Sequence, residues 1–379
     1  MPSMFLEKDF YRKGYTTVPG ALPPSVADAM LASVERLLNT EFNLSHISPS
    51  SEPPWPGGNQ NRVVEIVPTS DAPWWDDFLS LTPLHTALTT LTTRPCALKP
   101  NTPQTRHWYF PINYPESHPT FSTPSPNRRP ILHTSASSIP VSGRWQPINR
   151  RRYLGRGWHI DCGPGFPNPE LRTTSGDGRQ GPVILIVLSD CDVGEGGTCI
   201  VEGSHLAVYD YIDKIGEVSH EKLNEVFKAR MRRRINEGKA FLIDDDDGEN
   251  GDDVDGALKV TQIKAKKGDV ILMHPLVVHS GTTNCSDGKV RVMGNGVGTI
   301  EDWIEGMVDP LLVKTKEHVG IEGGWRILME EGGEDYLEKE MEEERRVKEI
   351  EKERVRKIRE ERRKKKDEKE RRKNDKMKK

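Results

Sequence analysis

The sequence has few cysteines and no pairing pattern among them. Its 379 residues contain five cysteines, an odd number, and no two of them are spaced as C-x-x-C. A disulfide framework or a cysteine-based zinc site is therefore not expected. A reducing compartment fits this composition better.

Long apolar runs are also missing. No stretch reaches the roughly 18 consecutive apolar residues that a transmembrane helix needs. The first residues, MPSMFLEKDFYRKGY, lack the apolar segment of a signal peptide. We therefore expect a non-secreted, cytoplasmic protein that does not enter a membrane. The sequence does not define its oligomeric state.

Charge of one sign is not in excess, since the formal net charge is −3. This balance gives no global case for binding nucleic acid or a membrane surface. The charges are segregated instead: residues 244–256 are acidic, and the last 20 residues are mostly Lys and Arg. The hydrophobic fraction of 34% is low because the charged C-terminal region dilutes an otherwise ordinary composition.

These shifts predict one domain over residues 1–330 and a tail over residues 333–379. Within the domain we expect a disordered acidic loop at 244–256 and an irregular, Pro/Ser/Arg-rich insertion at 95–152. Residues 340–379 contain no Gly or Pro and pair opposite charges at helical spacing, which predicts a solvated helix. Its basic end could also act as a nuclear address or contact nucleic acid.

Short apolar runs separated by turn signals predict strands. They are VILIVL (183–188), TCIV (198–201), DVILM (269–273) and VRVM (290–293). GEGG, KKGD and NCSDG lie between them and favour turns. Several short strands of this kind are typical of a β-sandwich or barrel. Residues 82–93 and 206–240 are predicted to be helical.

One short motif carries candidate chemistry. In Gly157-Trp158-His159-Ile160-Asp161, the His and the Asp are two residues apart, so an extended backbone directs both side chains to one side. A third ligand could come from His279. Two imidazoles and one carboxylate on one face of a metal leave three positions open, as in non-haem iron oxygenases.

Other histidines near these motifs have different expected roles. His205 and His274 are interpreted as structural or supporting groups. His274 stays an alternative to His279 as the third ligand; it precedes Pro275, which biases its backbone toward extended conformations.

Three blocks in order resemble the phytanoyl-CoA dioxygenase family of the cupin-like superfamily. They are GWHID (157–161), PVILIVLSDCDVGEGGTCIVEGSH (182–205) and KKGDVILMHPLVVHSGTTNCSDGKVR (266–291). The likeness covers roughly residues 4–310. Two departures are a long interval between Asp161 and His279 and the dissimilar region 95–152.

The resemblance implies a mainly β fold with flanking helices, built around a double-stranded β-helix (jelly-roll) core, followed here by the charged C-terminal helix. It implies that His159, Asp161 and His279 are the iron ligands. Arg291 matches the basic residue that holds the distal carboxylate of 2-oxoglutarate. Two further residues, Thr198 and Ser280, could add hydrogen bonds near this co-substrate.

The implied function is that of an Fe(II)/2-oxoglutarate-dependent dioxygenase that hydroxylates a small molecule and decarboxylates 2-oxoglutarate to succinate, using O2. Because related halogenases lack the carboxylate ligand, Asp161 favours hydroxylation. The substrate is not defined by the sequence. One alternative is a catalytically silent β-helix binding module with a nuclear or nucleic-acid-directed tail. Another is a cupin-like isomerase or sugar-binding protein that needs a metal but no 2-oxoglutarate.

Overall fold

The computed structural model divides the chain into two compact units, Met1–Glu330 and Glu331–Lys379. It describes residues 3–42, 61–66, 74–98, 108–113, 158–161, 180–215, 220–236, 240–243, 258–282, 284, 289–300, 310–319, 326 and 328, all in the first unit. The acidic segment 244–256, the tail 333–379 and most of the insertion 95–152 lie outside these residues, so their expected forms stay predictions. Among the helices described, none has the length and apolar character that a bilayer-spanning segment requires.

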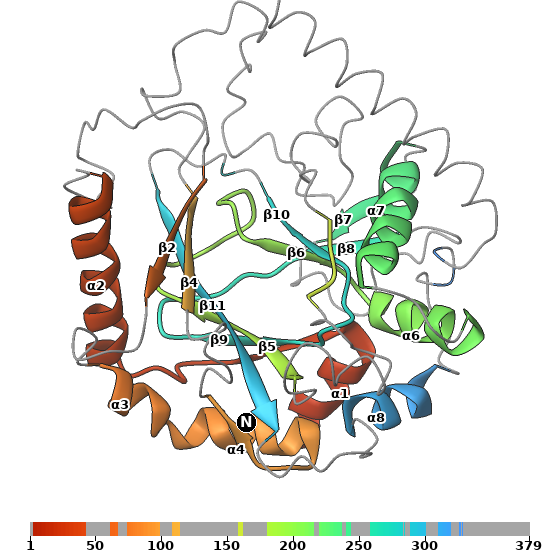
Figure 1. Cartoon of the computed structure of the whole chain (residues 1–379), viewed down its shortest axis with the longest axis horizontal. Coiled ribbons are helices and arrows are strands. Elements are labelled where there is room, and N and C mark those ends of the chain that lie inside the picture. Colours follow the sequence, from red (N-terminus) through yellow and green to blue (C-terminus); the bar gives the residue numbers. More distant parts are fainter. Residues whose placement is uncertain are drawn as a thin grey trace, which may run out of the picture. The chain divides into compact units, whose positions relative to one another are not determined.

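Helices flank the strands in the described part of the chain (Figure 1). The helices are α1 (Ser3–Lys13), α2 (Pro24–Phe42), α3 (Trp75–Leu79), α4 (Thr82–Thr92), α6 (Ser204–Ile215), α7 (His220–Asn236) and α8 (Pro310–His318). The strands are β1 (Tyr15–Val18), β2 (Asn61–Ile66), β3 (Cys96–Ala97), β4 (Trp108–Asn113), β5 (Gln180–Val187), β6 (Thr198–Val201), β7 (Ala240–Ile243), β8 (Leu258–Gln262), β9 (Val270–Met273), β10 (His279–Gly281) and β11 (Arg291–Ile300).

The strands form two sheets. The seven-stranded sheet has the order β1-β9-β5-β11-β4-β2, with β3 also paired to β11, and the four-stranded sheet has the order β10-β6-β8-β7. All pairs are antiparallel except β7 with β8. From β8 onward, consecutive strands change sheets at every step: β8 and β10 lie in the smaller sheet, β9 and β11 in the larger.

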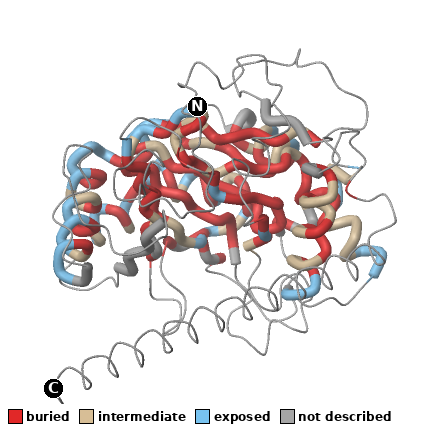
Figure 2. Tube along the Cα trace, turned by 90° about the horizontal axis from the view of Figure 1, so that it is seen from above, coloured by how far each residue is buried: buried red, intermediate tan, exposed pale blue. Residues whose placement is uncertain are grey.

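The seven-stranded sheet is covered on both faces, which explains its continuous apolar runs. In β9, Val270 and Leu272 pack into the core that includes residues of α1, α2 and α4. Ile271 and Met273 alternate with them and join a second core, which includes Ile200 of the four-stranded sheet. A strand buried on both sides needs apolar residues at every position. Figure 2 shows that the interior of the described part of the chain is mostly buried.

The four predicted strands are confirmed by β5, β6, β9 and β11. The single predicted helix over 206–240 is wrong in part, because the structure has α6, then α7, and then β7. Gly216 follows the last residue of α6 and Gly238 precedes β7; glycine at such positions favours the end of a helix.

The expectation of an irregular insertion over 95–152 is wrong at two places. Residues of β3 and β4 lie within it, and both strands join the larger sheet. The alternating side chains of Trp108, Phe110 and Ile112 pack into the helix-covered core. Proline is usually disfavoured inside a strand, because it lacks a backbone N–H donor. At Pro111 the favourable free energy of burying the three neighbouring apolar side chains outweighs this loss.

Two buried histidines lie where the larger sheet meets α1 and α8, and both are neutral. The His274 Nδ1 accepts the Leu276 N–H at 3.1 Å, so Nε2 carries the proton and donates to Thr315 Oγ1 at 2.9 Å. The His205 Nε2 donates to the Tyr11 carbonyl at 3.0 Å. Burial lowers the pKa of His205 to about 3 and the pKa of His274 well below its usual value. Both ring nitrogens of His274 are thus occupied, which removes it as an alternative metal ligand.

These two imidazoles predict a loss of stability in mild acid. In the unfolded chain each takes up a proton near pH 6.5, whereas in the folded chain neither does until the pH is far lower. Their contribution is therefore complete above about pH 6.5 and falls as the pH drops toward the folded pKa, by up to ~1.4 kcal/mol per pH unit for each histidine. His205→Gln keeps a donor for the Tyr11 carbonyl and removes one titrating group.

Urea unfolding of wild type and His205→Gln between pH 7 and pH 4.5 measures this effect. We expect the variant to have the shallower dependence of unfolding free energy on pH, by about one proton. Equal m-values serve as the control that both proteins unfold from comparable states. Parallel pH dependences for the two proteins would show that His205 titrates normally in the folded chain.

Candidate metal centre

His279 is the first residue of strand β10, and this strand positions its side chain. It lies opposite Ile200 of β6, and Ile200 belongs to the core between the two sheets. Directly opposed residues in an antiparallel pair share a face, so the imidazole points into the space between the sheets. Its Nδ1 donates to the Val277 carbonyl at 3.0 Å, so Nε2, which faces Asp161, is the nitrogen that can bind a metal.

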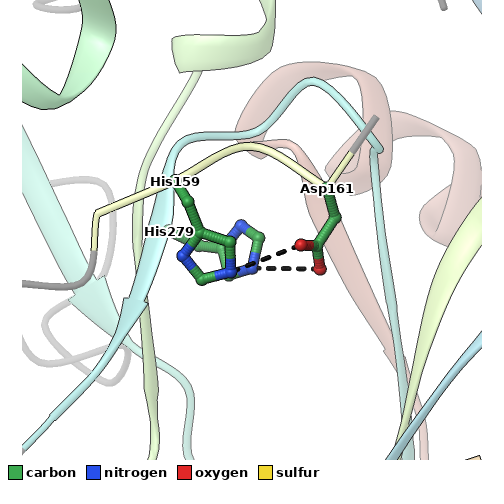
Figure 3. A group of neighbouring side chains, drawn as sticks. All are labelled: His159, Asp161 and His279. Atoms are coloured by element: carbon green, nitrogen blue, oxygen red, sulfur yellow. Dashed lines mark ion pairs between the residues drawn. The ribbon is translucent and has the colours of Figure 1, made fainter. Parts of the chain in front are cut away.

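The segment with the other two ligands is attached to the same strand. The His159 N–H donates to the His279 carbonyl at 2.9 Å, and the His279 N–H donates to the His159 carbonyl at 3.0 Å. This isolated antiparallel bridge places the two imidazoles side by side, with ring centroids 4.2 Å apart. Because the backbone is extended, Asp161 lies on the same side as His159, as Figure 3 shows.

The three side chains converge on one point. Asp161 Oδ1 lies 3.3 Å from His159 Nε2, and Oδ2 lies 3.3 Å from His279 Nε2. All three ligand atoms lie within 4.8 Å of one another. Ligands bound at about 2.1 Å and about 90° from one another are roughly 3 Å apart, so these donors fit a divalent metal with little movement. The set of two imidazoles and one carboxylate is the one that non-haem iron uses.

The charges at the centre favour the ligand form of the carboxylate. Burial by itself raises the pKa of Asp161, but the charge of His279 and hydrogen bonds from both imidazoles outweigh it, so the net pKa lies well below its usual value. The carboxylate is thus ionised at neutral pH. The His279 side chain is only 7% exposed, whereas those of Asp161 and His159 are 33% and 46% exposed. The centre is therefore closed on the β10 side and open on the other.

Arg291 lies at the start of β11 and faces the same space. Its neighbour Val292 packs in the helix-covered core and Met293 in the core between the sheets, so alternation directs Arg291 between the sheets. The guanidinium is buried, and its Nε donates to the Gly196 carbonyl at 2.7 Å. Among the described residues it makes no other hydrogen bond and no ion pair. Burial lowers the pKa of Arg291, but an arginine stays charged at neutral pH.

Asn113 of β4 is a member of this polar group that the sequence did not reveal. It lies opposite Arg291, and its Nδ2 donates to the carbonyls of Gly196 and Thr282 at 3.1 and 2.8 Å. Its Oδ1 is buried and has no hydrogen-bond partner within the described part of the chain. Gly196 has φ 77°, and a Cβ there would lie 2.5 Å from Asn113 Nδ2. The close approach therefore requires glycine.

The two remaining predicted residues lie on different faces. Thr198 of β6 is opposite Gly281, two residues from His279 and hence on the same face of β10. The space in front of Gly281 is open, with no atom within 4 Å of an added Cβ. Ser280 points to the opposite face of β10, and its Oγ donates to the Gly281 carbonyl at 3.2 Å. This position does not suit the co-substrate contact expected for Ser280.

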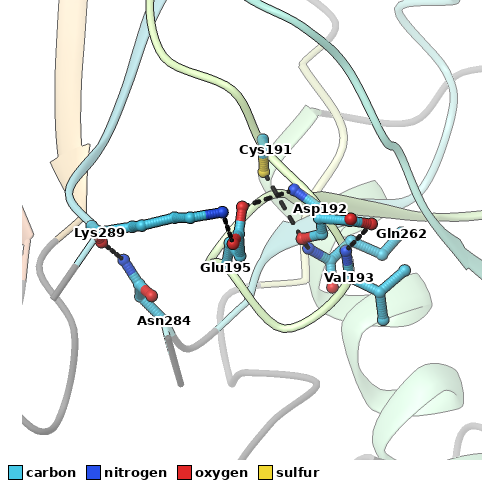
Figure 4. A network of polar contacts seen from close by, with 7 residues as sticks. All are labelled: Cys191, Asp192, Val193, Glu195, Gln262, Asn284 and Lys289. Atoms are coloured by element: carbon cyan, nitrogen blue, oxygen red, sulfur yellow. Dashed lines mark hydrogen bonds and ion pairs between the residues drawn. The ribbon is translucent and has the colours of Figure 1, made fainter. Parts of the chain in front are cut away.

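A polar network holds the loop that supplies the Gly196 carbonyl (Figure 4). Lys289 Nζ pairs with Glu195 Oε1, and Glu195 Oε2 accepts the Asp192 N–H at 2.9 Å. On the other side, Gln262 Nε2 donates to the Asp192 carbonyl at 3.0 Å. Asn284 forms a backbone bridge with Glu195. These contacts connect the loop to β8 and to the residues just before β11. They therefore fix the position of the Gly196 carbonyl, which accepts from Arg291.

The donor set of two imidazoles and one carboxylate is the one that non-haem iron, 2-oxoglutarate-dependent oxygenases use. Residues 154–293 match the family model described as phytanoyl-CoA dioxygenase (PhyH), which spans the three ligands and Arg291. This match confirms, over residues 154–293, the resemblance seen in the three sequence blocks. Iron and 2-oxoglutarate are the cofactor and co-substrate of this class.

Solved structures with a similar course of the chain have low identity to it. One is the non-heme alpha-ketoglutarate-dependent carbocyclase SnoK from nogalamycin biosynthesis, with 15% identity, coverage of 78% of this chain and 83% of that one, and a TM-score of 0.43. AviO1 from Streptomyces viridochromogenes has 15% identity, coverage of 80% and 96%, and a TM-score of 0.41. HygX from Streptomyces hygroscopicus, with nickel and 2-oxoglutarate bound, has 16% identity, coverage of 79% and 88%, and a TM-score of 0.39. A search of curated proteins finds no match.

The centre predicts stoichiometric binding of a divalent metal. Calorimetric titration with Ni(II) should give one site in wild type and none of comparable affinity in His279→Ala, because a bidentate remnant of the triad is far weaker. His274→Gln keeps a donor for Thr315 and should bind Ni(II) like wild type. If His274→Gln lost the metal and His279→Ala kept it, the ligand assignment would be wrong.

Proposed function

We propose that this chain is a catalytically active Fe(II)/2-oxoglutarate-dependent dioxygenase that hydroxylates a small molecule. His159, Asp161 and His279 are the proposed iron ligands. The observation that carries the proposal is the convergence of these three donors on one point, with one closed and one open side. When bound, iron and 2-oxoglutarate supply the oxidising chemistry, with succinate and carbon dioxide as co-products.

The proposed fold is a double-stranded β-helix. The changes of sheet from β8 to β11 support it, as does the bridge that adds the His159 segment to the edge of the four-stranded sheet at β10. In such a core the space between the sheets is closed at one end by apolar side chains. Here the core between the sheets takes that role, with Val187, Ile200 and Met293 among its members. Apolar walls keep water away from the reacting groups.

Arg291 is the proposed site for the distal carboxylate of 2-oxoglutarate. A buried cation without an anionic partner is costly, and an entering carboxylate would offset that cost through two parallel hydrogen bonds. Thr282, which accepts from Asn113, lies three residues from His279, or roughly 10 Å along an extended chain. A long arginine side chain and a five-carbon diacid can bridge this separation. Thr198, on the open face, is a further proposed contact.

The residues at the proposed metal centre have separate roles. The two imidazoles and the carboxylate would hold the metal, and the positions that they leave open would take co-substrate and oxygen. The Val277 carbonyl accepts from His279 Nδ1 and thereby orients the ring so that Nε2 would be the metal ligand. The exposed side of His159 and Asp161 is the proposed entrance for substrate.

Anaerobic titration with Fe(II) and 2-oxoglutarate, followed by visible absorption, tests the proposal. Wild type should develop a weak charge-transfer band, and His159→Ala should not. Arg291→Gln should still bind Fe(II), with an affinity for 2-oxoglutarate lower by about 10–100-fold, the loss expected for hydrogen bonds to a charged group. Arg291→Lys should lie between, because it keeps the charge and loses the fork geometry.

Arg12→Gln, at an exposed arginine of α1, is the matched control and should behave like wild type. A folded wild-type protein with no band would favour the silent binding module. A band that forms equally well in Arg291→Gln would leave the iron centre in place and remove Arg291 from the co-substrate site. Metal binding without any effect of 2-oxoglutarate would favour a cupin-like isomerase or sugar-binding protein.

A further inference from the structure

Only two peptide units separate the Cα atoms of the ligands His159 and Asp161. The side chain of Asn224 forms a hydrogen bond with each of these two units. The Ile160 N–H donates to Asn224 Oδ1 at 2.7 Å. Asn224 Nδ2 donates in turn to the Ile160 carbonyl at 3.3 Å. The N–H belongs to the first peptide unit and the carbonyl to the second. The Asn224 amide therefore supports both peptide units between the two ligands.

The need for this partner follows from the bridge to β10. The bridge uses both backbone groups of His159. In an extended chain the groups of the next residue point to the opposite edge, so those of Ile160 face away from β10. Ile160 is 1% exposed, so its backbone groups need hydrogen-bond partners within the protein. The Asn224 amide offers one donor and one acceptor, like the backbone of a neighbouring strand.

The helix that carries Asn224 is itself anchored. Phe227, one turn further along α7, is buried and packs edge-on against Tyr211 of α6, with centroids 5.7 Å apart. The Arg230 guanidinium lies 5.0 Å from the centre of the Tyr211 ring. Leu223, next to Asn224, is fully buried. The amide is thus presented from a packed helix and not from a loop, which is what precise support of a ligand segment requires.

We propose that Asn224 is a positioning residue for the metal centre. It contacts neither the metal nor a ligand side chain; it acts through Ile160, by setting the angle between the side chains of His159 and Asp161. Without it, the backbone between the two ligands rotates, and the 3.3 Å separation of His159 Nε2 and Asp161 Oδ1 is no longer maintained. The inference rests on the metal centre proposed above.

Titration of the full-length protein with Co(II), without 2-oxoglutarate, tests the role. The visible d–d bands report coordination geometry, and the titration gives the dissociation constant. Asn224→Ala should raise the Co(II) dissociation constant by about 10–100-fold, the usual effect of losing a group that orients ligands, and should alter the bands. In Asn224→Ser the side chain is too short to reach both peptide groups, so this variant should show the same higher dissociation constant and altered bands. It replaces the alanine variant in the test if that variant does not fold.

Two controls separate this role from general stability. Glu225→Gln changes the next residue of α7 and should leave the constant and the bands unchanged. Thermal unfolding of the metal-free variants measures any loss of helix packing. A folded Asn224→Ala or Asn224→Ser protein with a lower unfolding temperature but wild-type Co(II) affinity and bands would overturn the inference and leave the metal centre intact. Wild type that binds no Co(II) would overturn both.

Discussion

Two backbone hydrogen bonds between His159 and His279 join the parts of the chain that carry the metal ligands. They are 2.9 and 3.0 Å long and connect residues 120 positions apart in the sequence. Every other feature of the centre depends on them. They place the imidazoles side by side, and they extend the backbone so that Asp161 falls on the same side. Removing them would leave His279 on its strand with no carboxylate opposite it.

The bridge can form only because β10 lies at the edge of the four-stranded sheet. β6 occupies one side of β10, and the other side is free to accept a short segment. The same strand leads to Thr282, whose carbonyl and hydroxyl bind Asn113 and the loop before β6. One strand thus connects the metal ligands to the surroundings of Arg291. The apolar core beneath fixes the separation of the sheets, and so the distance across the site.

Much of this could be predicted from local patterns. The H-x-D spacing needs only an extended backbone to bring two ligands together, and the apolar runs of β5 and β9 are readable because both faces are buried. The supporting amides were not predictable. Asn113 lies in a segment rich in Pro, Ser and Arg, and Asn224 lies on a helix with an ordinary amphipathic pattern. Their roles come from contacts made across 83 and 64 residues, which leave no periodic signal. For Ser280, alternation around His279 already indicated the opposite face.

The three ligands differ in burial, and this difference bears on the selectivity of the metal site. His279 is fixed by a paired strand, by the Val277 carbonyl and by burial. The segment that carries His159 and Asp161 is joined to β10 by a backbone bridge and to α7 by the Asn224 amide, and both ligand side chains are partly exposed. A metal site stays selective only when its geometry is imposed by the protein, because raw affinity favours other divalent ions over iron. The more exposed half of the centre, His159 and Asp161, therefore depends on its backbone supports to distinguish iron from other divalent ions, and one of these supports comes from α7, a helix that contributes no ligand.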